Sequence, residues 1–137
     1  MNGLEALHDA VMTMEGWHPG SRSQVNRNPG NLRGSRTVAH QMDAGGYAVF
    51  SSITLGSTAL LNLFRDYGEG YIAEGVTWDS TLDTIFQHYA PQADHNNPNT
   101  YALFVAGFVS HCLGKPFTHL STLREVCAEF LAGGNLL

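Results

Sequence analysis

The chain has 137 residues, of which 43% are hydrophobic and 14% are charged, and its formal net charge is −5. This length predicts one compact domain over residues 1–137, which can bury roughly two-thirds of its unfolded surface without a disulfide or a metal. The acidic balance argues against a general nucleic-acid-binding protein, because such a protein needs a basic face. The many aromatic and aliphatic residues argue against a disordered chain.

The sequence carries two cysteines and no recognisable targeting segment. Cys112 and Cys127 have no histidine at ligand spacing, so ordinary buried thiols are expected, and a disulfide between them cannot be read from the sequence. No apolar run reaches the ~18 residues of a transmembrane helix. The N-terminus lacks the basic and apolar segments of a secretory signal peptide. We therefore expect a protein that is made in the cytoplasm and does not insert into a membrane.

The first part of the chain predicts a helix, a loop and a hairpin. Apolar residues recur at steps of three and four over residues 3–15, which predicts an amphipathic helix ended by Gly16. Residues 16–36 are rich in glycine, proline and asparagine, a composition that opposes regular structure and predicts a long polar loop. Residues 37–50 place two short runs around an Asp-Ala-Gly-Gly turn, which predicts a β-hairpin.

The remainder of the chain predicts helices. They are a helix capped by Ser52 that reaches Tyr67, a helix capped by Asp79 or Ser80 and stopped by Pro91, a helix from about Thr100 to Leu113 ended by Gly114, and a helix from about Ser121 to Leu131 ended by Gly133 and Gly134. The complete order predicts a small α+β domain that is mostly α.

Glu15 is the strongest candidate for a catalytic residue. At about 100° per residue it falls on the apolar side of the first helix rather than opposite it. Loss of hydration there raises the pKa of a carboxyl, and the negative end of the helix dipole acts in the same direction. Trp17 can cover the carboxyl with its indole ring. A glutamate protonated near neutral pH suits general acid catalysis, whereas the alternative is a frayed side chain in water.

The polar loop offers groups that suit carbohydrate and carboxylate ligands. Asn26, Asn28 and Asn31 can each donate and accept hydrogen bonds, as sugar hydroxyl and acetamido groups require. Arginine suits carboxylates, and the loop contains Arg22, Arg27, Arg33 and Arg36. No acidic residue lies between Glu15 and Asp43. The alternative is an ordinary asparagine-rich turn with solvated charges.

Other chemistries have weaker support. A polar cluster of Asp94, Asn96, Asn97 and Asn99 resembles a calcium loop, but the glycine at its sixth position and the acid at its twelfth are missing. The seven histidines are scattered, and the chain has no zinc motif, nucleophilic-serine motif or phosphate-binding loop. We therefore expect neither a metal nor a cofactor.

A second carboxylate would decide the reaction type. A glycosidase with two carboxylates needs a partner for Glu15 at about 5–9.5 Å, and Asp43 is the only candidate before the helical half. Asp43 also fits the hairpin turn on structural grounds alone. In that case Glu15 acts alone, and the substrate must supply its own nucleophile. The muramyl 6-hydroxyl of peptidoglycan can do so, and its attack leaves a 1,6-anhydro sugar.

Several groups of residues together resemble a family of small phage and prophage lysozyme-like proteins. They are Glu15-Gly16-Trp17, Ser21-Arg22, the RNPGNLR segment from Arg27 to Arg33, Gly46 to Phe50, Gly56, Tyr89-Ala90-Pro91, Asp94, Asn96-Asn97-Pro98 and Tyr101. The resemblance covers residues 4 to about 114. Members of this family are usually described as lytic transglycosylases or phage structural muralytic domains.

The resemblance implies a lysozyme-like fold, with a catalytic glutamate at the end of the first long helix, a small hairpin, and a helical lobe that closes a sugar cleft. It implies that Glu15 is the general acid and base. Together with the residue chemistry above, it suggests substrate contacts from Trp17, Ser21, Arg27, Asn28, Asn31, Arg33, Phe50, Tyr89, Asn97 and Tyr101. Tyr89 and Tyr101 are also expected to contact Glu15 or a sugar ring.

We therefore expect a phage or prophage lytic transglycosylase that cuts peptidoglycan glycan strands at the bacterial cell wall, after holin-dependent release or as part of a virion. One alternative is a hydrolysing muramidase that uses Glu15 with Asp43. A second alternative is a wall-binding or virion structural protein with the same fold and no catalytic activity.

Overall fold

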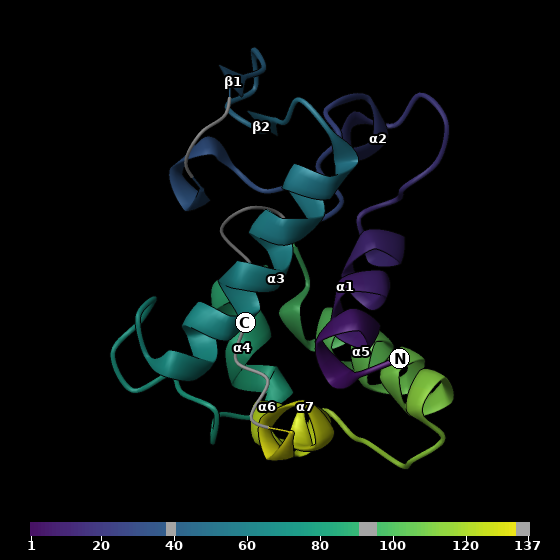
Figure 1. Cartoon of the computed structure of the whole chain (residues 1–137), viewed down its shortest axis with the longest axis vertical. Helices are drawn as coiled ribbons and strands as arrows, with labels where there is room; N and C mark the ends of the chain where they lie inside the picture. The colour runs from purple at the N-terminus through teal and green to yellow at the C-terminus, as the bar shows by residue number, and fades with distance from the viewer. Residues whose placement is uncertain (38–40, 91–95, 134–137) are drawn as a thin grey trace.

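The computed structural model describes residues 1–37, 41–90 and 96–133 and has the predicted order of elements. The elements are α1 (Gly3–Met14), α2 (Arg22–Val25), the 3-10 helix η1 (Gly34–Arg36), β1 (Gln41–Met42), β2 (Ala48–Val49), α3 (Ile53–Glu69), α4 (Leu82–Tyr89), α5 (Pro98–Leu113), α6 (Leu123–Val126) and α7 (Ala128–Ala132). The hairpin and α2 lie at one end of the molecule, and α6 and α7 lie at the other (Figure 1). The mostly helical α+β class is confirmed.

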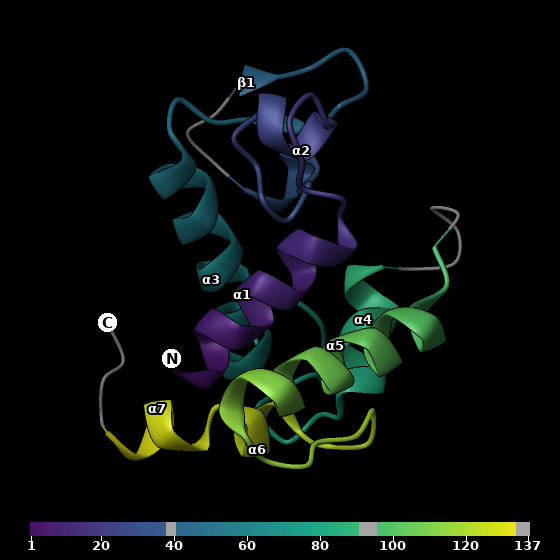
Figure 2. The ribbon, with the colours of Figure 1, turned by 90° about the vertical axis from the view of Figure 1, so that its right-hand side faces the viewer.

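Helix α1 lies at the centre of the helical part and ends as predicted. It begins at a capping box, in which the Asn2 side chain accepts from the backbone N–H of Glu5 and the Glu5 side chain accepts from that of Asn2. Its apolar face packs against α5 and α3 (Figure 2). Gly16 has a φ of 77°, and the N–H of Trp17 donates to the carbonyl of Met12, which closes the helix with a left-handed glycine.

The prediction of an irregular loop over residues 16–36 is wrong in part. Arg22–Val25 form one turn of helix, capped by the Ser21 hydroxyl, which accepts from the N–H of Gln24. Gly34–Arg36 form one 3-10 turn. Elements of three or four residues are too short for apolar periodicity to appear, so the composition of the segment was a misleading guide.

The β-hairpin is confirmed, with strands of two residues each. Gln41 pairs with Val49 and Met42 with Ala48 in antiparallel register, and an isolated bridge joins Arg33 to Tyr47. The polar loop therefore pairs with the hairpin along one of its edges.

The N-caps of α3 and α4 show how well the sequence predicted where these helices begin. Ser52 caps α3 as predicted. Thr81, rather than Asp79 or Ser80, caps α4, because its hydroxyl is the group that reaches the N–H of Thr84. Pro91, predicted to stop this helix, lies outside the described residues.

The last two predicted helices differ from the structure at their boundaries. Helix α5 begins at Pro98, earlier than predicted, because the Asn97 side chain caps it and proline is suited to a first turn. It ends at Gly114 as predicted. The last predicted helix is instead two short ones, α6 and α7, interrupted at Cys127.

Buried side chains, most of them from the helices, form one hydrophobic core. Cys127 is buried in it and Cys112 is half-buried, and both are free thiols. Among the described residues, no helix is long and apolar enough to cross a membrane.

Candidate active site

Glu15 is held between the end of α1 and helix α5. It is the C-cap residue of α1, and its Oε2 accepts a hydrogen bond of 2.7 Å from the hydroxyl of Tyr101. The side chain is half-buried, and this burial raises the pKa of the carboxyl. Hydrogen bonds from Tyr101 and Asn31 and the charge of Arg36 oppose the shift but do not cancel it. The prediction of a desolvated carboxyl at the helix end is confirmed.

Stacked aromatic rings fix the position of the Tyr101 hydroxyl. The Tyr101 ring stacks on Phe86 at a centroid distance of 4.8 Å and meets the edge of Tyr89 at 5.9 Å. Tyr89 in turn stacks on Phe64 at 5.7 Å. Burial raises the pKa of the Tyr101 hydroxyl above its usual range, which favours its protonated, hydrogen-bond-donating form.

A cavity of about 150 Å³ opens beside Glu15. It lies where the polar loop and the hairpin meet the end of α4, and its lining is mostly polar. The described residues that line it are Glu15, Gly30, Asn31, Leu32, Arg33, Arg36, Tyr47, Tyr89, Ala90 and Asn96. Charged and amide groups therefore surround Glu15, the one carboxyl among the described residues whose pKa is raised by burial.

Asn31 lines this cavity and has one buried acceptor without a hydrogen-bond partner. Its backbone is left-handed, with a φ of 49°, a conformation that asparagine tolerates better than most residues. Its side chain lowers the pKa of Glu15, whereas its Oδ1 is buried and has no hydrogen-bond partner in the structure. A buried acceptor without a partner costs stability.

Asn28 lies in the same motif but has a structural role. It is fully buried, and its Nδ2 donates to the carbonyls of Leu32 and Ala48, both at 2.9 Å. Its Oδ1 accepts from the N–H of Leu32, also at 2.9 Å. All the side-chain bonds of Asn28 are therefore spent on joining the loop to the hairpin, and the side chain cannot reach a ligand.

Tyr89 and Arg36 build the wall of the cavity next to α4. The Tyr89 hydroxyl donates to the carbonyl of Gly30 at 2.6 Å and not to Glu15. Arg36 donates from one Nη to the carbonyl of Tyr89 at 2.8 Å and from the other to that of His88 at 2.7 Å. These bonds satisfy the free carbonyls at the end of α4 and connect the polar loop to the helical part.

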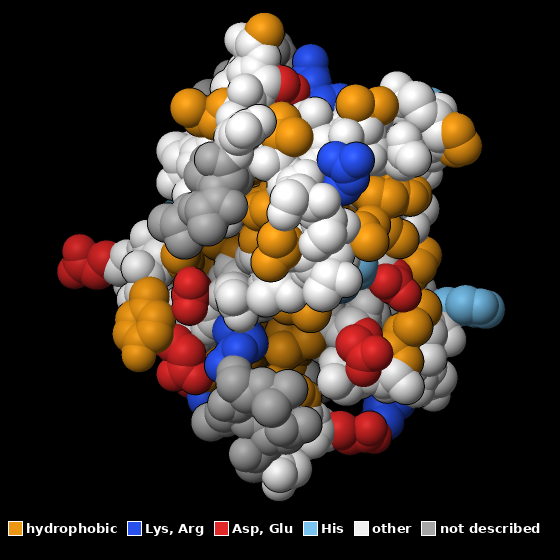
Figure 3. All heavy atoms as spheres, turned by 45° about the horizontal axis from the view of Figure 1, so that its top comes forward, with side chains coloured by type: hydrophobic (Ala, Val, Ile, Leu, Met, Phe, Trp, Pro, Cys, Tyr) orange, Lys and Arg blue, Asp and Glu red, His pale blue; other side chains and the backbone are white. Residues whose placement is uncertain are grey.

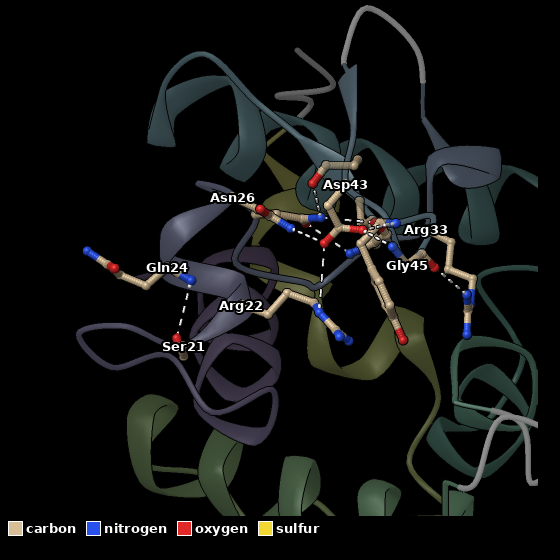
Figure 4. Close-up of polar contacts among 11 residues, drawn as sticks. Ser21, Arg22, Gln24, Asn26, Arg33, Asp43 and Gly45 are labelled. Atoms are coloured by element: carbon tan, nitrogen blue, oxygen red, sulfur yellow. Dashed lines mark hydrogen bonds and ion pairs between the residues drawn. The ribbon is translucent and has the colours of Figure 1, made fainter.

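Asp43 is occupied by the hairpin turn, as its turn sequence predicts. One carboxylate oxygen accepts from the N–H groups of Gly45 and Tyr47 at 2.9 and 3.0 Å. The other accepts from the Asn26 amide at 2.9 Å and lies 3.8 Å from Nε of Arg22 (Figure 4). These contacts, led by the Asn26 bond, lower the pKa of Asp43. Asp43 is not among the described residues that line the cavity of Glu15.

The remaining predicted contact residues lie in several places. Trp17 and Arg27 line a second, shallow hollow with Val25 and Ile53, rather than the cavity of Glu15. Phe50 is buried, and Ser21 and Asn97 are helix caps. Asp94 lies outside the described residues, whereas its neighbour Asn96 reaches the cavity.

Arg36 and Tyr47 line the cavity but were not predicted as site residues. Arg36 was visible only as one of four arginines in the loop, and Tyr47 only as part of the hairpin segment. No local sequence signal distinguishes them, because their partners lie elsewhere in the chain.

On the face drawn in Figure 3, most acidic side chains lie in the lower half of the view, whereas basic side chains occur in both halves.

Among the described residues, no group of three or more His, Cys, Asp and Glu side chains is placed to hold a metal ion. The chain matches no family model, and no curated protein and no solved structure is detectably similar to it.

Proposed function

We propose that this chain is a lytic transglycosylase with a lysozyme-like fold that cleaves peptidoglycan glycan strands at the bacterial cell wall. The observation that carries this proposal is the Glu15 carboxyl, which burial keeps protonated to a higher pH than usual and which Tyr101 orients beside a polar cavity. A positioned acid of this kind is what cleavage of a glycosidic bond requires.

The reaction needs one carboxyl that acts twice. Protonated Glu15 donates its proton to the glycosidic oxygen as the bond from that oxygen to the anomeric carbon of the muramyl residue breaks. The resulting carboxylate then removes the proton from the muramyl 6-hydroxyl as its oxygen bonds to the anomeric carbon. Glu15 is protonated again at the end, and the products are a 1,6-anhydromuramyl end and a free 4-hydroxyl, with no water consumed.

The neighbours of Glu15 support both halves of this cycle. The bond from Tyr101 stabilises the carboxylate formed midway, while burial favours the protonated acid at the start. Asn31 lines the cavity, where its side chain is placed to meet a sugar hydroxyl or acetamido group. Arg33 lies at the cavity, and we assign Trp17 and Arg27, at the second hollow, to a more distant part of the strand.

Hydrolysis by Glu15 with Asp43 has less support. Both oxygens of Asp43 already accept hydrogen bonds inside the hairpin turn, and the low pKa of this carboxyl makes it a weak base. A carboxylate that activates water needs a free oxygen directed at the reaction centre.

The test is mass spectrometry of sacculi digested by the purified chain in ¹⁸O-labelled water. We expect 1,6-anhydromuramyl ends without ¹⁸O, and loss of at least a hundredfold in rate for Glu15→Gln, as for removal of a general acid. Glu74→Gln is the matched control, because Glu74 is exposed and distant in sequence from the cavity residues. Reducing ends that carry ¹⁸O would identify a hydrolase, and binding to sacculi without any release of fragments would identify a structural protein.

A further inference from the structure

Two arginines lie against the same tyrosine ring at the cavity. The guanidinium carbon of Arg22 lies 4.4 Å from the centroid of the Tyr47 ring, and that of Arg33 lies 4.7 Å from the same centroid. The two charges are therefore separated by no more than the sum of these distances, which is below the Debye length of about 10 Å at 0.1 M salt. Like charges held this close repel each other, and the contact of each guanidinium with the ring offsets part of that cost.

Neither guanidinium is fully used by the protein. Arg33 makes one long hydrogen bond, 3.5 Å from Nη1 to the carbonyl of Gly45. Arg22 approaches Asp43 through Nε at 3.8 Å, and its side chain is 52% exposed. Arg36, in contrast, spends both Nη groups on the carbonyls of α4. In Figure 4 the guanidinium groups of Arg22 and Arg33 both lie below Asp43.

The geometry points to a clamp, made of Arg22, Tyr47 and Arg33, that binds a carboxylate of the peptide stem attached to the glycan. This inference rests on the proposed function for the identity of the strand. The Tyr47 ring holds both guanidinium groups in place before the ligand arrives, which reduces the entropy lost on binding. Because Arg33 and Tyr47 also line the cavity of Glu15, a bound stem would fix the register of the sugar beside the acid.

The chemistry of the polymer explains why a stem is the expected ligand. In intact peptidoglycan the lactyl carboxyl of the muramyl residue is consumed in the amide bond to the peptide, so the glycan backbone itself is uncharged. The anionic groups belong to the stem. A guanidinium matches a carboxylate with two parallel N–H···O bonds, whereas neutral sugars need no such pair.

The test measures binding in the Glu15→Gln background, so that no turnover occurs. Fluorescently labelled strands without cross-links are prepared with stem amines acetylated and stem carboxylates either free or converted to amides. We expect strands with free stem carboxylates to bind about tenfold more tightly than strands with amidated stems at low salt. This is the difference expected for one charge-assisted contact. Adding Arg22→Gln and Arg33→Gln should abolish this preference.

Two further variants separate a clamp from general positive charge. Tyr47→Leu keeps both arginines but removes the ring that both contact, and should reduce the preference for free carboxylates. Lys115→Gln removes one positive charge from an exposed ion pair with Glu129, and should leave the preference at tenfold. Thermal melts of each variant confirm that it is folded.

The clamp is refuted if the Glu15→Gln protein binds strands with free and with amidated stem carboxylates with equal affinity, or if it binds neither. It is also refuted if the double arginine variant keeps the preference or if Lys115→Gln loses it. Equal binding, combined with 1,6-anhydro products from the wild-type chain, would leave the transglycosylase standing without the clamp. A clear preference without any cleavage would support the clamp and reject the transglycosylase.

Discussion

Replacement of Asn28 by alanine tests whether the first asparagine of the RNPGNLR motif stabilises the fold or binds the substrate. The Asn28 side chain makes three hydrogen bonds, one from the N–H of Leu32 and two to the carbonyls of Leu32 and Ala48. The Leu32 carbonyl keeps a second bond, because it also accepts from the N–H of Ala48 at 2.9 Å. Asn28→Ala therefore leaves two buried backbone groups without the bond shown here, the N–H of Leu32 and the carbonyl of Ala48.

The expected cost is a large part of the stability of a domain of this size. A buried backbone group without a partner costs about 1–3 kcal/mol, so two such groups lower the free energy of unfolding by about 4 kcal/mol. The total free energy of unfolding of a small domain is about 5–15 kcal/mol. With a urea slope near 2 kcal/mol per molar, the unfolding midpoint should fall by about 2 M.

Urea denaturation followed by circular dichroism measures this shift, with Asn31→Gly as the matched control. Asn31 belongs to the same motif, and glycine tolerates the positive φ of this position. Loss of the Asn31 side chain should therefore change the urea midpoint little while weakening strand binding. A midpoint for Asn28→Ala within about 0.3 M of wild type, together with weaker strand binding, would refute the structural role and return Asn28 to the ligand contacts.

Three further predictions concern the acid and its surroundings. Because the pKa of Glu15 is raised in the folded protein, the stability that this carboxyl contributes is complete below its ordinary pKa of 4.5 and is lost as pH rises through the folded value. Glu15→Gln should therefore gain stability relative to wild type as pH rises above 4.5. Thermal melts from pH 4 to 8 measure this difference, and the opposite trend would contradict burial as the cause of the raised pKa. Tyr101→Phe removes a bond that lowers the pKa of Glu15, so the basic limb of the kcat/KM profile should move to higher pH, and an unmoved limb would exclude Glu15 as the titrating acid. In Gly30→Ala the added Cβ would lie 2.7 Å from the Tyr89 hydroxyl and 2.8 Å from a Leu60 methyl, so calorimetry should record a loss of about 1–3 kcal/mol, and unchanged stability would show that these side chains can move aside.

Local signals in the sequence were sufficient where a structural feature depends on neighbours in the chain. The 3.6-residue periodicity and Gly16 place the end of α1, and with it the position of Glu15. Ser52 caps α3, and Asp43 forms the hairpin turn through groups two and four residues away. In each case the decisive hydrogen bond or φ angle lies within about one turn of backbone, so the residue types carry the information themselves.

Short elements escaped prediction for the same physical reason. Helix α2 has four residues and α6 has four, which is close to a single turn and leaves no room for an amphipathic pattern. Isolated helices of this length are unstable, so packing and a capping hydroxyl, rather than propensity, decide where they form.

The sequence by itself determined a mostly helical α+β domain and a glutamate at the end of its first helix. Only the tertiary structure decided that Tyr101, 86 residues from Glu15, donates to it while Tyr89 donates to Gly30, and that Arg36 donates to the carbonyls at the end of α4. The tertiary structure also decided that Asn28 joins the loop to the hairpin while Asn31 lines the cavity. Two asparagines three residues apart look alike in a sequence, because burial and hydrogen-bond partners are set by segments that meet only after folding.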